Sequence, residues 1–178
     1  METMSRTAIH SMTILAAAAL ASAPLFAQGG LEALGAYAGV WQSKGVSHDT
    51  AYSKAGNNSA ETRCNWSPNH GFLVCDQTVH PPDGGTQNDL SIYTYNDSDG
   101  TYQFTGLSRG SSRVRNLKLT IEGRRWTYSS QFDAGGKTVH FRTVNEFVSP
   151  SKVTFRAEYS EDGKTWTLMS EGASERAQ

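Results

Sequence analysis

The sequence predicts an all-β protein, an antiparallel up-and-down β-barrel of about 9–10 strands that follows a short N-terminal helix. Apolar and polar residues alternate through most of the chain after residue 39, as they do on the two faces of a β-strand. Turn-forming segments such as 96–100 and 133–136 separate these stretches. A meander of this many strands is usually closed, because closure removes its exposed edges. A two-sheet sandwich is the main alternative.

The first 27 residues are predicted to be a cleavable signal peptide. The apolar, Ala-rich run 12–26 is shorter than the roughly 20 residues of a membrane-spanning helix. Small residues mark two possible cleavage sites, one that ends at Ala23 within this run and one that ends at Ala27 just after it. We expect cleavage after Ala27, because the other site leaves Pro24 beside the cut. A secreted or periplasmic location follows, with no membrane insertion after cleavage; a retained N-terminal anchor is the alternative.

Residues 28–178 are predicted to form a single domain, whose roughly 150 residues are enough to bury a core. The whole chain carries 16 basic and 17 acidic residues, and no basic stripe stands out. We therefore expect no nucleic-acid partner. The oligomeric state is left open.

The first element of the domain is expected to be a short helix. Leu31, Leu34 and Ala38 recur at helical spacing, with Gly29-Gly30 before them and Gly39 after them. This pattern predicts at most about two to three helical turns.

Strands are expected from there to the end of the chain. In one of them, Val153, Phe155 and Ala157 share a face, while Thr154 and Arg156 lie on the opposite one. Only the tail 173–178 is expected to fray. After a first strand that begins near Trp41, the alternation predicts strands around 60–66, 72–78, 90–95, 102–105, 117–122, 126–128, 139–143, 153–159 and 166–168.

The two cysteines, Cys64 and Cys75, are predicted to form a disulfide. An even number of cysteines in an exported chain favours one. The strands that carry them flank the turn-forming segment 68–71. If Trp66 faces Leu73 across this hairpin, Cys64 faces Cys75 directly, at what would have to be a non-hydrogen-bonded pair. A metal or redox pair is the alternative, but it needs closer Cys spacing or His partners.

The segment 34–43 places Gly39-Val40-Trp41 at the start of the first strand, directly after the helix. It resembles the opening of lipocalin-like barrels of the calycin type, in which the Trp plugs one end and often stacks against an Arg of a late strand. The chain is also similar to a bacterial secreted family of unknown function with such a barrel. The likeness extends over residues 31–172 and rests on the opening Leu-x-x-x-x-Gly-x-Trp, on segments 141–144 and 149–155, and on an ending like 159–166.

The resemblance implies a structural role for Trp41, with its ring covered by Arg156 or Arg176. Lipocalins bind small hydrophobic molecules, and a barrel of this size has room for one small ligand. A related ten-stranded family binds haem through a His, but no His lies near the C-terminus here, so no cofactor is expected. The leading interpretation is non-catalytic binding of a small apolar molecule. The candidate ligand-binding residues are Trp41, Tyr93, Phe104, Trp126, His140, Phe141, Phe155 and Arg156.

Two alternatives stay open. The barrel could be filled by side chains and act as a structural or interaction module of the cell envelope. It could also be an enzyme that pairs His140 with Glu146 or Glu158. Residues 106–110 match the spacing Gly-x-Ser-x-Gly, but this segment is predicted to be a strand connection and lacks the following helix that a nucleophile elbow requires. No His-Glu-x-x-His or phosphate-cradling motif occurs, so no catalytic or metal-binding residue is assigned. The direction of the 140-142-144-146 face decides between these interpretations, and the sequence cannot fix it because a one-residue slip in register exchanges the two faces.

Overall fold

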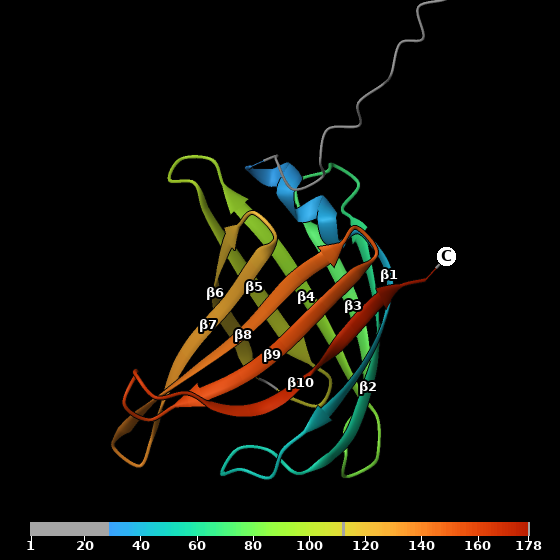
Figure 1. The fold of residues 1–178 in the computed structure, drawn as a ribbon. Coiled ribbons are helices and arrows are strands. Elements are labelled where there is room, and N and C mark those ends of the chain that lie inside the picture. The colour runs from blue at the N-terminus through green and yellow to red at the C-terminus, as the bar shows by residue number, and fades with distance from the viewer. Residues whose placement is uncertain (1–28, 112, 178) are drawn as a thin grey trace, which may run out of the picture.

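Ten antiparallel strands, joined in sequence order, close on themselves in the structure (Figure 1), a computed structural model that describes residues 29–111 and 113–177. Each strand pairs with its neighbours along the chain, and β1 pairs with β10. The predicted up-and-down barrel with a short helix is confirmed, and this closure excludes the sandwich. The predicted signal peptide lies outside the described residues. The elements are η1 (Leu31–Tyr37), β1 (Gly39–Ser47), β2 (Gly56–Trp66), β3 (Leu73–His80), β4 (Gln87–Asn96), β5 (Thr101–Ser108), β6 (Val114–Glu122), β7 (Arg125–Ala134), β8 (Lys137–Ser149), β9 (Lys152–Ser160) and β10 (Thr167–Arg176).

The last strand is longer than the sequence predicts, and the expectation that the tail frays is wrong. β10 continues to Arg176, which pairs with Trp41 of β1. The inward positions near its end are Gly172 and Ser174, which give no apolar alternation to detect. Small residues stand there because the ring of Phe155 fills the adjacent interior: a Cβ atom added at Gly172 would lie 2.7 Å from it.

The helix η1 closes one end of the barrel, the upper end in Figure 1. It is a 3-10 helix of seven residues, and Leu34 and Tyr37 of its apolar face join the hydrophobic core. Leu34 is completely buried. The hydroxyl of Tyr102 on β5 donates a hydrogen bond to the Gly30 carbonyl at 2.9 Å, which ties the start of the helix to the barrel wall.

The Gly-x-Trp segment joins this helix to β1. Gly39 has φ 113°, a conformation that side-chain-bearing residues rarely adopt. The Trp41 ring is 1% exposed, and its Nε1 donates to the Tyr37 carbonyl at 2.8 Å. The Arg176 guanidinium lies 4.5 Å from the centre of that ring and donates to the carbonyls of Ala36 and Ala38. Arg176 therefore covers Trp41, as the resemblance implies, and it also fixes the end of η1.

Cys64 and Cys75 form the predicted disulfide inside the barrel. They face each other directly across β2 and β3, and Trp66 faces Leu73, as predicted from the hairpin. Their Cα atoms are 4.0 Å apart, which is the close approach of a non-hydrogen-bonded antiparallel pair. The bridge therefore joins two strands of the wall near the η1 end. No helix among the described residues is long and apolar enough to cross a membrane.

Candidate functional site

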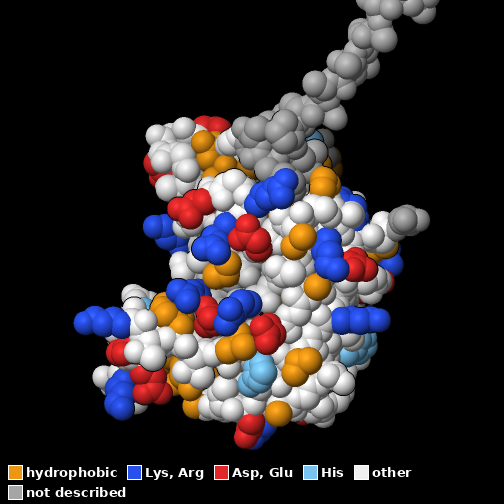
Figure 2. Space-filling model, in the orientation of Figure 1, with side chains coloured by type: hydrophobic (Ala, Val, Ile, Leu, Met, Phe, Trp, Pro, Cys, Tyr) orange, Lys and Arg blue, Asp and Glu red, His pale blue; other side chains and the backbone are white. Residues whose placement is uncertain are grey.

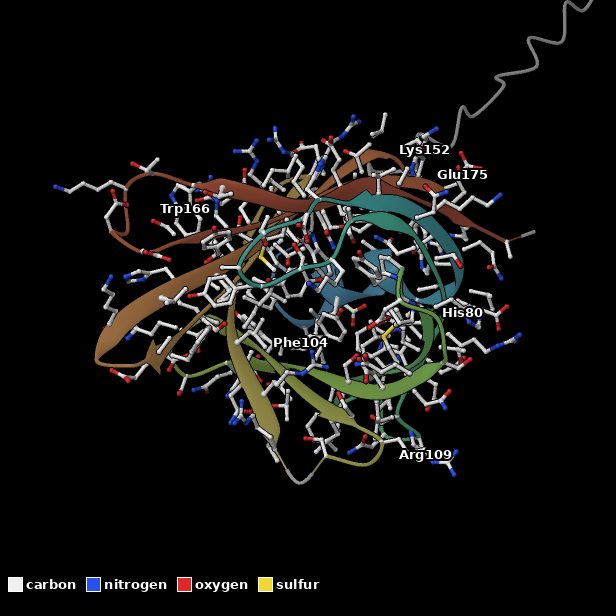
Figure 3. All side chains as sticks on the ribbon, turned by 90° about the horizontal axis from the view of Figure 1, so that it is seen from below. His80, Phe104, Arg109, Lys152, Trp166 and Glu175 are labelled. Carbon is white, nitrogen blue, oxygen red and sulfur yellow. A yellow bond between two sulfur atoms is a disulfide. The ribbon has the colours of Figure 1, made fainter. Side chains whose placement is uncertain are left out.

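A cavity of about 720 Å³ occupies the barrel between η1 and the opposite end. Figure 3 looks in from that opposite end and shows η1 at the far side, with Phe104 inside the barrel. The interior is therefore not filled by side chains, as a solid barrel requires. The residues that line the cavity are Tyr37, Trp41, Ser43, Asn58, Ser59, Ala60, Thr62, Gln77, Val79, Ser91, Tyr93, Phe104, Arg113, Val114, Arg115, Asn116, Leu117, Tyr128, Ser130, Gln131, Phe132, Phe141, Thr143, Asn145, Phe155 and Ser174.

Aromatic rings form the walls in the inner part of the cavity. Tyr93, Phe104 and Tyr128 come from β4, β5 and β7 and meet edge to face. Their ring centres are 5.1 to 6.2 Å apart, the range of favourable aromatic pairs. Because these strands alternate inward and outward residues, every second side chain contributes to the wall. The result is a firm apolar surface inside the barrel.

A polar cluster lies at the η1 end of the cavity. Asn145 on β8 donates through Nδ2 to the Tyr37 hydroxyl at 2.5 Å. The hydroxyls of Tyr93 and Tyr128 are 3.3 Å apart. Burial, the largest cause, raises the pKa of Tyr93 to about 12, although its hydrogen bond with Tyr128 opposes the rise. Burial likewise raises the pKa values of Tyr37 and Tyr128 far above the ordinary value. All three phenols are neutral at physiological pH, as an ordinary tyrosine is, and burial extends their neutral form to higher pH.

The open end carries a second set of rings. Tyr52 lies in the loop between β1 and β2, and its ring packs against Phe132, Phe141 and Tyr159 at centroid distances of 5.9, 5.4 and 4.8 Å. In Figure 3 the teal loop between β1 and β2 extends across part of the opening. This loop therefore narrows the entrance over β7, β8 and β9.

The charges that line the cavity are all positive within the described residues: Arg113 and Arg115 of the β5–β6 side, with no Asp or Glu in the lining. Arg115 is paired with Asp89 at 3.0 Å, and the Asp89 side chain is itself only 10% exposed. The described lining also contains no His, Cys or Lys. The cavity thus offers aromatic surface, neutral hydrogen-bonding groups and two guanidinium groups.

Most of the predicted ligand-binding residues meet in this cavity. Trp126 lies beside it, 1% exposed, with its ring 5.1 Å from that of Tyr37. It belongs to the packing around the helix and is not part of the lining. The predicted residues that line the cavity are Trp41, Tyr93, Phe104, Phe141 and Phe155.

The sequence predicts that His140 and Arg156 bind the ligand, but the register of β8 and β9 places both on the outer face of the barrel. Val139 is 1% exposed and faces inward, so His140 next to it faces outward. The His140 ring lies against the β9–β10 turn at Gly163. Arg156 is also on the outer face, where it reaches Glu158 at 3.5 Å. The sequence alone cannot show this, because both faces of these strands contain polar and apolar residues.

Glu146 and Glu158, the carboxylates that the enzyme hypothesis pairs with His140, also lie on the outer face. Glu158 pairs with Arg142 at 2.6 Å, and Glu146 pairs with Arg125 at 3.1 Å. Figure 2 shows blue and red side chains interspersed over the face that carries β8, β9 and β10 in Figure 1. These groups are engaged in surface ion pairs, and His140 is not brought to them inside a cavity. The proposed His140–carboxylate site is therefore not formed. Among the described residues, no group of three or more His, Cys, Asp or Glu side chains could hold a metal ion.

Asn145, Tyr37 and Tyr128 are site residues that sequence reasoning missed. A signal existed for Asn145: it continues the face of Phe141 and Thr143 at a spacing of two, directly before the buried Phe147. A polar residue inside such an apolar series is a candidate for an interior role. Tyr37 gives no comparable signal, because its position depends on how η1 enters the barrel.

The comparisons with known proteins agree with this architecture. No family model matches the chain, and no curated protein matches it. The crystal structure of Rv2717c from M. tuberculosis is similar, with a TM-score of 0.57 and 10% identity over 83% of this chain and 97% of that one. The S-type phycobiliprotein lyase CPES from Guillardia theta is similar as well, with a TM-score of 0.58 and 10% identity over 86% of this chain and 95% of that one.

Identities this low show the fold alone. Together with the closed ten-stranded barrel and its short helix, these likenesses define the class: the chain has a lipocalin-like, calycin-type fold.

Proposed function

We propose that this protein binds a small, largely apolar molecule inside its barrel and performs no chemistry on it. The observation that carries the proposal is the 720 Å³ cavity with aromatic walls. Ligand sites are typically concave and mostly apolar, with a few polar groups that orient the guest. The cavity volume falls within the usual range of about 300–1,000 Å³ for such sites.

The site chemistry supports binding over catalysis. A general acid–base mechanism needs a titratable group close to the reacting atom. The described lining offers neutral phenols, amides and hydroxyls, with Arg113 and Arg115 near the open end. The barrel is closed by η1 at one end, so a guest enters from the other and is surrounded by the wall.

A melting-temperature screen tests the proposal. The probes are palmitate, farnesol, protoporphyrin and the dye 1-anilinonaphthalene-8-sulfonate. The tetrapyrrole is included because one structural neighbour is a phycobiliprotein lyase. A probe at about 100 times its Kd stabilises the native state by about 2.7 kcal/mol, which raises the Tm of a domain of this size by about 5 °C or more. We expect such a rise for at least one probe; an unchanged Tm with all four contradicts the proposal.

The protein is further proposed to be exported, with cleavage after Ala27. The apolar run 12–26 supports this, as does the disulfide between Cys64 and Cys75, because disulfides persist in oxidising compartments. N-terminal sequencing of the protein from the periplasm or medium of a bacterial host checks the proposal. A chain that begins at Gln28 is the expected result, and a protein found only inside the cell with residues 1–27 intact contradicts it.

A further inference from the structure

One buried side-chain polar atom in the described part of the chain has no hydrogen-bond partner: Oδ1 of Asn145. The residue is 8% exposed, and its Nδ2 already donates to the Tyr37 hydroxyl. A buried acceptor that has lost water and gained no partner is costly, and native structures contain few of them. The unpaired oxygen therefore calls for a physical explanation.

The position of Asn145 supplies one. The side chain projects inward from β8 and lines the cavity at the η1 end. Across the sheet it pairs with Trp126 of β7 and Phe155 of β9, and neither side chain donates a hydrogen bond to this oxygen. Two residues nearer the open end, Thr143 lines the same wall. A group that reaches the deep end of the cavity thus meets the Asn145 amide.

The surroundings of the amide restrict what that group can be. The hydroxyls of Tyr37, Tyr93 and Tyr128 surround the deep end and are neutral at physiological pH, as tyrosine hydroxyls ordinarily are. The rings of Tyr93, Phe104 and Tyr128 form the adjacent walls. Aromatic walls favour flat rings packed against them. The unpaired atom is an acceptor, so its complement is an N–H or O–H group.

We propose that the deep end of the cavity recognises an N–H or O–H donor at the leading edge of a flat aromatic or conjugated ligand, with Asn145 Oδ1 as the acceptor. The terminal torsion of an Asn side chain is soft, so a modest rotation presents the oxygen to the guest. This inference rests on the proposed binding function and adds to it the chemical class and orientation of the ligand.

A pair of probes that differ in one hydrogen-bond donor tests it. 2-Naphthol has an O–H group where 2-methoxynaphthalene has a methyl ether on the same ring system. Each is titrated into the full mature chain, and binding is followed by calorimetry. We expect 2-naphthol to bind roughly tenfold more tightly, as one buried hydrogen bond predicts. In Asn145→Leu that preference falls to about one, because 2-naphthol loses affinity while 2-methoxynaphthalene does not.

Thr127→Val is the matched control, since it removes a polar group from the outer face of the neighbouring strand, opposite Val144. It is expected to keep the preference for 2-naphthol. If the two probes bind the wild type with equal affinity, the inference is overturned but the proposed binding function is not. This comparison uses the wild type alone, so it does not depend on whether a variant folds. A preference that persists in folded Asn145→Leu also overturns it. If neither probe binds the wild type, both the inference about Asn145 and the proposed binding of flat apolar guests are overturned.

Discussion

Tyr37, Tyr93 and Tyr128 place three phenols inside the barrel, where their hydroxyls serve as neutral hydrogen-bonding groups. Each pKa is raised mainly by burial, because the phenolate form would lose its hydration. The hydrogen bond that Tyr37 accepts from Asn145 lowers its pKa, but this effect is smaller than that of burial. The deep end of the site is therefore uncharged, whereas the entrance carries Arg113 and the Arg115–Asp89 ion pair.

These phenols predict a loss of stability at alkaline pH. In the unfolded chain a tyrosine titrates near its ordinary value of about 10, whereas in the folded protein the pKa of Tyr93 is about 12. The stabilising effect of the neutral form is complete below pH 10 and is lost as the pH rises through the folded pKa. Between these values each such tyrosine lowers the free energy of unfolding by up to about 1.4 kcal/mol per pH unit.

Urea unfolding between pH 9 and 12 measures this effect. Tyr93→Phe keeps the ring and removes the titrating group, so its free energy of unfolding is expected to fall less steeply with pH than that of the wild type. Parallel curves for the two proteins would show that Tyr93 is not a source of the alkaline instability.

At the scale of elements, β1 and β10 form the closing seam of the barrel, and a pair of glycines allows it. Gly45 faces Gly172 across the seam. A Cβ atom at Gly172 would lie 2.2 Å from the Lys44 carbonyl oxygen and 2.6 Å from the Gly45 Cα atom, both of them backbone atoms that cannot turn aside. The ring of Phe155 lies against the same spot from inside. The seam therefore depends on the absence of a side chain here.

Gly172→Ala is expected to lower the free energy of unfolding by about 1–3 kcal/mol, since the added methyl group forces the backbone apart. Chemical denaturation measures the change. Gly71→Ala is the control, because the atoms nearest to a Cβ there belong to the Asn69 side chain and lie at an ordinary contact distance of 3.4 Å; a change within about 0.5 kcal/mol is expected for it. A Gly172→Ala variant as stable as the control would show that the seam between β1 and β10 can accommodate a side chain at residue 172.

The strands show why sequence predicts the barrel better than the site. Period-two alternation identifies strands such as β9, and the Cys64–Cys75 pairing follows from the length of one hairpin. The direction of each face does not follow, because the outward face of β8 and β9 carries ion pairs such as Arg142–Glu158 whose partners lie on different strands. Asn145 and Tyr37 meet across 108 positions of sequence, and only the closed barrel brings them together.

For the molecule as a whole, the proposed binding function depends on a barrel that is closed on its sides, plugged by η1 at one end and hollow between its walls. The plug is held by the last strand, since Arg176 donates hydrogen bonds to the carbonyls of Ala36 and Ala38 at the end of η1. The proposed function requires that a guest occupies this interior.

Two neighbouring serines of β7 test that claim directly. Ser130 lines the cavity, whereas Ser129 pairs with Arg142 of β8 on the outer face. Ser130→Phe places a ring in the cavity, and Ser129→Phe adds the same ring outside. Binding of 1-anilinonaphthalene-8-sulfonate is measured by equilibrium titration with its fluorescence as the signal. We expect its affinity to fall about tenfold or more in Ser130→Phe, since a loss of about 1.4 kcal/mol in binding free energy corresponds to tenfold. In Ser129→Phe the affinity is expected to stay within about twofold of the wild type. Equal affinities in the two folded variants would place the dye outside the barrel and contradict binding in its interior.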